Sequence, residues 1–275
     1  MSYKKLLLTL ASAGSLFALS GCGNQANEVV RLGVIGEDND VWEFVQDKVA
    51  DQGIDLELVS FSDYSQPNRA LDEGDIDLNA FQTRIFLDSF NEEFGSNIVP
   101  IADTVIAPLG IYSEEVQDVS EIGEGAEIAI PNEVSNEGRA LVLLQSAGLL
   151  EVDPDAGILP TTDDITNNPL NLEITQLDAS QTARSVGDVT AAVINSGMAV
   201  DAGYKPNEDA IFLEPADENS EPYINVIAAN EGDERESFDI IVDAYQSEDT
   251  LEVIREVSEN SEIVVWAEEG YEFSE

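Results

Sequence analysis

The feature that most constrains the fold is the regular alternation of short apolar runs with segments of helical periodicity. In the first example, a strand pattern at residues 30–35 is followed by a helical pattern at 40–49 and a second strand pattern at 54–61. This order is typical of parallel crossover units, and their repetition predicts an α/β fold. Further strands are expected at 76–78, 98–106, 109–112, 127–130, 172–177, 190–194 and 223–228, and further helices at 67–73, 84–94, 136–147, 181–186 and, as a pair, within 236–257.

The chain is expected to form two lobes. Pro108 interrupts the series of predicted strands and marks a point where the chain passes into a second lobe. The β-rich run at 223–228 is placed to return it. We expect lobe 1 to comprise residues 29–107 and 229–275 and lobe 2 to comprise residues 108–228. Because ligands of such sheets bind beyond the carboxyl ends of the strands, a ligand cleft is expected between the lobes.

The N-terminus has the features of a secretory signal peptide. Two lysines precede an uncharged, mostly apolar run at residues 6–19, which is shorter than the roughly 20 residues that span a bilayer. A leucine and two small residues directly precede Cys22, a pattern that resembles a bacterial lipobox. We therefore expect a signal peptide at 1–21, a lipidated N-terminus and tether at 22–28, and a location on the outer face of the cytoplasmic membrane. A stray thiol in a signal peptide is the alternative.

Composition excludes several kinds of chemistry. The chain has no histidine and Cys22 is its only cysteine, so disulfides, Cys-rich or His-rich zinc sites, Ser-His-Asp triads and Cys-His pairs are excluded. We expect no metal, no cofactor and no catalytic residue. With 57 acidic and 11 basic side chains the formal net charge is −46, which excludes nucleic acid as a partner. Molar salt screens such self-repulsion, so the charge predicts a salt-adapted source; an acidic protein of ordinary salt is the alternative.

Two aromatic residues are candidates for a ligand pocket. Tyr64 ends the segment Phe61-Ser62-Asp63-Tyr64, and Phe81 lies in Asn79-Ala80-Phe81-Gln82, each just after a predicted strand. A tyrosine and a phenylalanine that face inward form an apolar slot suited to a thioether or another soft side chain. Ordinary core packing is the alternative for each ring.

A polar loop at residues 131–136 leads from a predicted strand into a predicted helix. Ser135 is a suitable N-cap, and the free N–H groups of a helix start favour an anion. Arg139 adds a planar guanidinium that can hold a carboxylate through two bonds, although pairing with a nearby glutamate is the alternative in so acidic a chain. Asn195 and Asn225 lie at strand edges or turns and offer both donors and acceptors.

Several ordered blocks of the chain resemble the NlpA family of lipoproteins, the methionine-binding components of ABC importers. The blocks cover nearly the whole mature sequence and include Phe61-Ser62-Asp63-Tyr64, Asn79-Ala80-Phe81-Gln82, Ile130-Pro131-Asn132 with Ser135-Asn136 and Arg139-Ala140-Leu141, Ala191-Ala192-Val193-Ile194-Asn195, and Pro222-Tyr223-Ile224-Asn225-Val226. The resemblance implies a hinged, two-lobed fold of the periplasmic-binding-protein kind, type II. Such a protein closes on one free amino acid and delivers it to a membrane permease driven by a separate ATPase.

The same resemblance implies roles for individual residues. Tyr64 and Phe81 would line the side-chain pocket, Arg139 would hold the α-carboxylate, and Asn136, Asn195 and Asn225 would complete the polar ring. The implied protein is a monomeric, lipid-anchored binding protein for L-methionine or a close analogue, and not an enzyme.

Two departures from the family pattern bear on the ligand. The family usually has histidine after Phe-Gln, where this chain has Thr83, and it tends to have a second asparagine where this chain has Ser196-Gly197-Met198. Another amino acid or a methionine-containing dipeptide is therefore an alternative ligand. A carboxylate-based hydrolase and a surface adhesin are alternatives of other classes.

Overall fold

The structure is a computed structural model that describes residues 27–37, 39–215 and 218–267. The predicted signal peptide, Cys22 and most of the predicted tether lie outside these residues. Within the described ranges, no helix combines the length and the apolar character that a bilayer span requires.

One lobe is built on a six-stranded mixed sheet with the strand order β13-β4-β12-β3-β1-β2. Its strands are β1 (Glu28–Ile35), β2 (Ile54–Phe61), β3 (Leu78–Thr83), β4 (Ile98–Ile106), β12 (Ile224–Asn230) and β13 (Ile263–Val264). Its helices are α1 (Asp40–Ala50), α2 (Pro67–Glu73), α3 (Arg84–Phe94), α8 (Glu236–Tyr245) and α9 (Glu248–Val257). β1 and β2 are parallel along their whole length and are connected by α1, as the predicted crossover requires.

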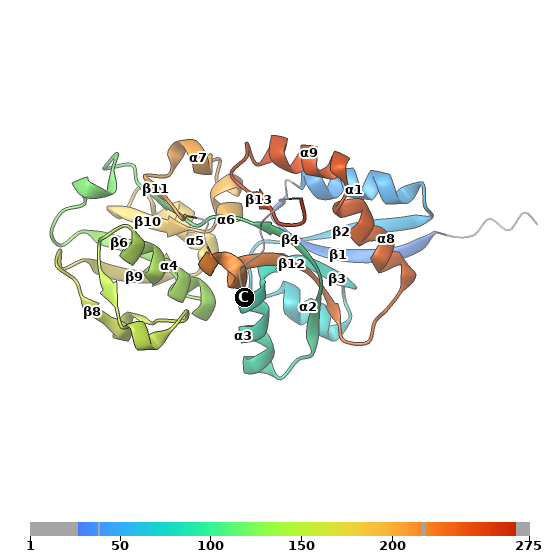
Figure 1. Cartoon of the computed structure of the whole chain (residues 1–275), viewed down its shortest axis with the longest axis horizontal. Helices are drawn as coiled ribbons and strands as arrows, with labels where there is room; N and C mark the ends of the chain where they lie inside the picture. The colour runs from blue at the N-terminus through green and yellow to red at the C-terminus, as the bar shows by residue number, and fades with distance from the viewer. Residues whose placement is uncertain (1–26, 38, 216–217, 268–275) are drawn as a thin grey trace, which may run out of the picture.

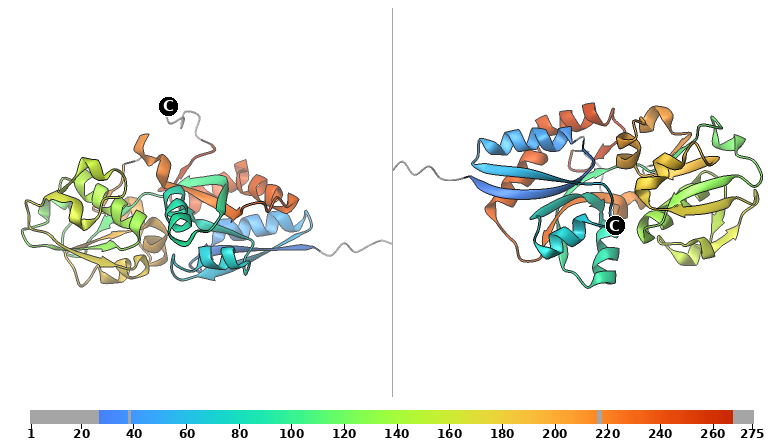
Figure 2. Two further views of the ribbon diagram at one scale, coloured as in Figure 1. Left: turned by 90° about the horizontal axis from the view of Figure 1, so that it is seen from below. Right: turned by 180° about the vertical axis from the view of Figure 1, so that it is seen from behind.

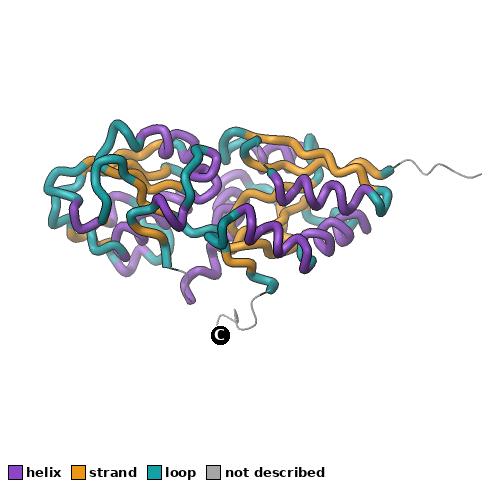
Figure 3. Tube along the Cα trace, turned by 90° about the horizontal axis from the view of Figure 1, so that it is seen from above, coloured by secondary structure: helices purple, strands orange, loops and turns teal. Residues whose placement is uncertain are grey.

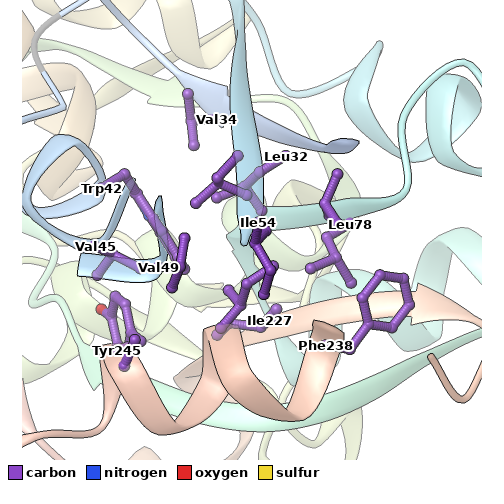
Figure 4. Packing of buried hydrophobic residues seen from close by; sticks show 14 of the residues in the cluster. Leu32, Val34, Trp42, Val45, Val49, Ile54, Leu78, Ile227, Phe238 and Tyr245 are labelled. Atoms are coloured by element: carbon purple, nitrogen blue, oxygen red, sulfur yellow. The ribbon is translucent and has the colours of Figure 1, made fainter. Parts of the chain in front are cut away.

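Helices cover both faces of this sheet. In Figure 1, α1, α8 and α9 lie on one face and α2 and α3 on the other. The main core lies under the first group, where Trp42 of α1 stacks on Tyr245 of α8 with ring centroids 4.6 Å apart, close to Val49 (Figure 4). On the opposite face, Leu71 of α2 and Leu87 of α3 belong to a separate cluster. Each fully buried side chain of this size contributes about 1.5–3 kcal/mol relative to exposure.

The other lobe is built on a five-stranded sheet with the order β11-β5-β10-β6-β9. Its strands are β5 (Gly110–Tyr112), β6 (Glu127–Pro131), β9 (Glu173–Leu177), β10 (Ala191–Ile194) and β11 (Phe212–Leu213), and β7 (Glu151–Val152) pairs with β8 (Ile165–Asn167) beside them. Its helices are α4 (Val134–Ser146), α5 (Ala179–Ser185), α6 (Ser196–Asp201) and α7 (Pro206–Asp209). Figures 2 and 3 show the two sheets with their helices as lobes that lie side by side.

The chain passes between the sheets twice, from β4 to β5 and from β11 to β12. Pro108 lies in the first crossing, between Ile106 and Gly110. β12 pairs with Ile106 of β4 from its first residue, Ile224, so the whole strand belongs to the six-stranded sheet. The residue boundaries of the lobes remain a prediction, and because of this pairing we propose that the second boundary lies before Ile224 rather than after residue 228.

Two differences between the predicted and the observed elements affect the candidate site. β3 spans Leu78–Thr83 instead of 76–78, because antiparallel pairing with β12 continues to Thr83. Phe81 therefore lies within a strand and not after one. α4 begins at Val134, and its N-cap is Glu133, without a side-chain cap bond. The prediction of Ser135 as the N-cap is wrong, because this residue lies inside the first turn and is only 3% exposed.

Candidate functional site

A cleft of about 260 Å³ lies between the two lobes. Its walls come from the segments that follow β1 and β2, from β3, and from the starts of α4 and α6. This volume is close to the lower end of the range found for small-molecule pockets. All six residues predicted to form a ligand site line this cleft: Tyr64, Phe81, Asn136, Arg139, Asn195 and Asn225. The structure thus brings them together, and their roles toward a ligand stay predictions.

Three aromatic rings form an apolar wall of the cleft. The ring centroids of Tyr64 and Phe81 are 5.8 Å apart, and Phe86 lies 5.7 Å from Phe81 and 6.1 Å from Tyr64. Phe86 lies in the helix predicted at 84–94 and was not among the residues predicted to line a pocket. Its position depends on Thr83, whose Oγ1 accepts a hydrogen bond from the backbone N of Phe86 and so starts α3 at the end of β3. Burial raises the pKa of Tyr64, so its hydroxyl stays protonated at neutral pH.

A buried amide network supports the aromatic wall from within the lobe. Asn68 and Asn79 are 0% exposed and Gln82 is 2% exposed. Asn68 Nδ2 donates to Gln82 Oε1 at 2.6 Å, and Asn68 Oδ1 accepts from Asn79 Nδ2 at 2.8 Å and from Gln82 Nε2 at 2.7 Å. Because Asn79 and Gln82 flank Phe81 in β3, this network holds the strand that carries the ring.

Arg139 is 3% exposed and is held at the crossings between the lobes. Its Nε donates to Glu214 Oε1 at 2.9 Å, and its Nη2 donates to Glu214 Oε2 at 2.5 Å and to the carbonyl of Ala107 at 3.0 Å. The guanidinium carbon lies 4.4 Å from the ring centroid of Tyr223. The glutamate pairing considered from the sequence is therefore present. Nη1 makes no hydrogen bond to any described residue, which leaves two N–H donors at the cleft wall.

The three candidate asparagines approach the cleft from different elements. Asn195 Nδ2, at the N-cap of α6, donates to Asn136 Oδ1 of α4 at 3.1 Å. Asn195 Oδ1 is buried and has no hydrogen-bond partner in the described part of the chain. Asn225 Nδ2 donates to the carbonyl of Val105 at 3.2 Å, which fixes the orientation of its amide in β12. An unpaired buried acceptor costs about 1–3 kcal/mol, so Asn195 is suited to receive a donor from a ligand.

A further carboxyl group, Glu262, lines the cleft beyond α9. Burial raises the pKa of Glu262 to about 7. The unfolded chain has a glutamate pKa of about 4.3, so between these two values the native state binds more protons than the unfolded state, and stability falls as the pH rises. We expect the stability of wild type relative to E262Q to fall by at most about 1.4 kcal/mol per pH unit across this range.

Urea unfolding at several pH values checks this expectation. The matched control is E256Q, at an exposed position of α9, which should follow wild type. An E262Q profile parallel to that of wild type contradicts a raised pKa for Glu262.

The described residues contain no group of three or more Cys, Asp or Glu side chains arranged to hold a metal ion. The cleft is lined by Arg139 with free Nη1 donors, by Asn195 with an unpaired acceptor, by aromatic rings and by carboxyl groups such as Glu262. The donors, the acceptor and the rings suit noncovalent binding of a small zwitterion.

The chain is similar to known proteins of one family. The sequence model of the family described as NlpA lipoprotein matches residues 30–266. The chain belongs to this family. Among curated NlpA relatives, the D-methionine-binding lipoprotein MetQ of Escherichia coli is 37% identical over 268 residues, which cover 94% of this chain and 98% of the relative. The resemblance inferred from the sequence is thus confirmed.

Solved structures give the same result for the fold. A nutrient-binding protein from Burkholderia cenocepacia bound to methionine has a TM-score of 0.81 and 38% identity, over 86% of this chain and 99% of that chain. The substrate-binding protein of a methionine transporter from Streptococcus pneumoniae has a TM-score of 0.81 and 39% identity, over 86% and 96% of the respective chains. The predicted α/β, periplasmic-binding-protein-like fold of this NlpA protein is confirmed.

The two departures from the NlpA pattern both lie at the cleft. Thr83 lines it and caps α3, and Ser196 and Gly197 line it in the first turn of α6. Thr83 places a hydroxyl at this side of the cleft, and its Oγ1 accepts a hydrogen bond from the backbone N of Phe86.

Proposed function

We propose that this protein is an extracytoplasmic solute-binding lipoprotein that delivers L-methionine or a close analogue to an ABC importer. Membership of the NlpA family supports the binding role, and the printed names of the relatives support methionine as the ligand. The partner is then a membrane permease with its ATPase, in line with the methionine-transporter protein of Streptococcus pneumoniae. Anchoring through a lipidated Cys22 and a monomeric state are parts of this proposal.

The observation that carries the proposal is the opposition of charge-binding groups and aromatic rings across one cleft. Arg139 offers free Nη1 donors to a carboxylate, and Asn195 offers an unpaired Oδ1 to an ammonium group. The rings of Tyr64, Phe81 and Phe86 form an apolar wall, where each contact with a thioether sulfur contributes about 0.3–1.5 kcal/mol. Micromolar affinity needs about −8 kcal/mol, which a ligand of roughly nine heavy atoms can supply.

A thermal-shift screen in molar salt, followed by calorimetry, tests the function. L-methionine and D-methionine are compared with norleucine, which has the same side-chain length but no sulfur. Ligand at 100 times Kd stabilises by about 2.7 kcal/mol, so a bound amino acid gives a clear increase in Tm. We expect methionine to bind more tightly than norleucine. A protein whose Tm responds to no amino acid or dipeptide contradicts the proposal.

A methionine-containing dipeptide or another amino acid is the second candidate ligand. Thr83 favours it, because a threonine in place of the usual histidine leaves room beside the aromatic wall. The same screen separates the two candidates, since a dipeptide site gives a larger shift with glycyl-methionine than with methionine.

A further inference from the structure

Glu133 lies at the start of α4, directly behind the cleft wall. Its Oε1 accepts a hydrogen bond from the backbone N of Ala179 at 3.1 Å, and its Oε2 accepts from Asn136 Nδ2 at 3.2 Å. Glu133 itself is not among the described residues that line the cleft, whereas Asn136 and Asn195 are. Glu133 lines a neighbouring pocket together with Tyr64 and Phe86, and it contacts the polar residues of the cleft through Asn136.

Two hydrogen bonds connect Glu133 to Asn195, and each fixes which end of an asparagine amide donates and which end accepts. A carboxylate only accepts, so Asn136 must direct Nδ2 toward Glu133 and Oδ1 toward Asn195. Asn195 must then donate its Nδ2 to Asn136 Oδ1, at 3.1 Å, and its own Oδ1 is left without a donor. Asn136 and Asn195 are 5% and 8% exposed, so water competes little for these positions.

The acceptor at the end of this relay belongs to Asn195, which lines the same cleft as Arg139. Arg139 follows Asn136 by three positions on α4, and residues at this spacing are neighbours on a helix surface. The residues that line the cleft thus include Arg139, whose Nη1 has no partner among the described residues, and Asn195, whose Oδ1 is unpaired. These groups complement a carboxylate and an ammonium group.

We infer that Glu133 is a positioning residue that selects the α-amino group of the ligand by setting the direction of the Asn136–Asn195 amide relay. The inference rests on the proposed binding of an amino acid. Glu133 acts on the amino group through its hydrogen bond to Asn136 and the hydrogen bond from Asn195 to Asn136. Without the carboxylate, both amides can reverse and present Asn195 Nδ2 to the cleft, a donor facing the donors of an ammonium group.

The substitution E133Q tests the relay because it preserves size while changing polarity. The backbone N–H of Ala179 is a fixed donor and retains the new carbonyl oxygen, so the new NH₂ group faces Asn136 and reverses it. Calorimetry compares L-methionine with 4-(methylthio)butanoate, which has the same carboxylate and thioether but no amino group. We expect E133Q to reduce the preference for the amino acid by about 10- to 100-fold, mainly through weaker methionine binding.

The variant E137Q serves as a matched control for the E133Q test, and the double variant E133Q/N136D tests whether the effect can be reversed. Glu137 of α4 accepts a hydrogen bond from Thr162 N at 3.1 Å. In the variant E137Q, the preference for the amino acid over the analogue without an amino group should stay as in wild type. In the double variant E133Q/N136D the new amide donates to the new carboxylate, which accepts again from Asn195 Nδ2. Asn195 Oδ1 is then restored to the cleft, and we expect the preference for the amino acid to return.

Failure of this inference differs from failure of the proposed function. A wild-type protein that binds no amino acid overturns the proposed function. A wild-type protein that binds methionine, together with an E133Q variant of unchanged preference, overturns the relay alone. Should E133Q fold poorly, the double variant decides, because a folded double variant without preference for the amino acid also overturns the relay.

Discussion

Replacing Arg139 by alanine is expected to weaken methionine binding by about 10- to 150-fold, because a hydrogen bond to a charged group contributes about 1.5–3 kcal/mol. The same substitution should destabilise the ligand-free protein. It leaves Glu214 without its cationic partner, and the side chain of Glu214 is only 15% exposed. Removing one member of a buried ion pair costs about 3–5 kcal/mol, so R139A should unfold at a clearly lower urea concentration.

The two effects of R139A can be separated. In R139A/E214Q the uncompensated charge is removed, so stability should recover while methionine binding stays weak. R84A is the matched control, since Arg84 pairs with Asp103 on a more exposed part of the chain, and such pairs contribute about 0–1 kcal/mol. Wild-type affinity in R139A by calorimetry refutes the role of Arg139 in holding a carboxylate.

Secondary structure was predictable where apolar periodicity reports burial. The expected strand at 54–61 and the expected helix at 84–94 match β2 and α3, because their buried residues are aliphatic or aromatic and recur at the period of the element. β3 was predicted too short because Asn79 and Gln82 are fully buried polar residues. Their amides are satisfied only by one another and by Asn68, and hydropathy along the chain does not report such a partnership.

The candidate site was predictable to a similar extent, for a different reason. Tyr64 follows β2 of one sheet and Asn136 follows β6 of the other, and ligands bind beyond the carboxyl ends of such strands, so the positions of both residues in the cleft followed from topology. The hydrogen-bond partners of Arg139 and Asn136 did not follow from topology. Glu214 is 75 positions from Arg139, and a chain with 57 acidic residues offers many equivalent candidates. Only the pairing of distant segments in three dimensions selects Glu214 for Arg139 and Asn195 for Asn136.

Replacing Asn68 by alanine is expected to have the second large effect. The substitution removes the acceptor of Asn79 Nδ2 and the donor to Gln82 Oε1. Both groups are buried, and each buried polar group left without a partner costs about 1–3 kcal/mol, which gives about 2–6 kcal/mol in total. Urea unfolding of N68A measures this loss. Methionine binding should weaken as well, because Phe81 lies between Asn79 and Gln82 in β3.

Asn132, an exposed asparagine in the loop before α4, provides the matched control. N132A should change stability by no more than about 0.5 kcal/mol, the usual range for a surface substitution away from special features. A loss in N68A as small as that in N132A contradicts a stabilising role of the network. A large loss in N68A with unchanged methionine affinity instead separates the network from the site, because the position of Phe81 then does not depend on the amides beside it.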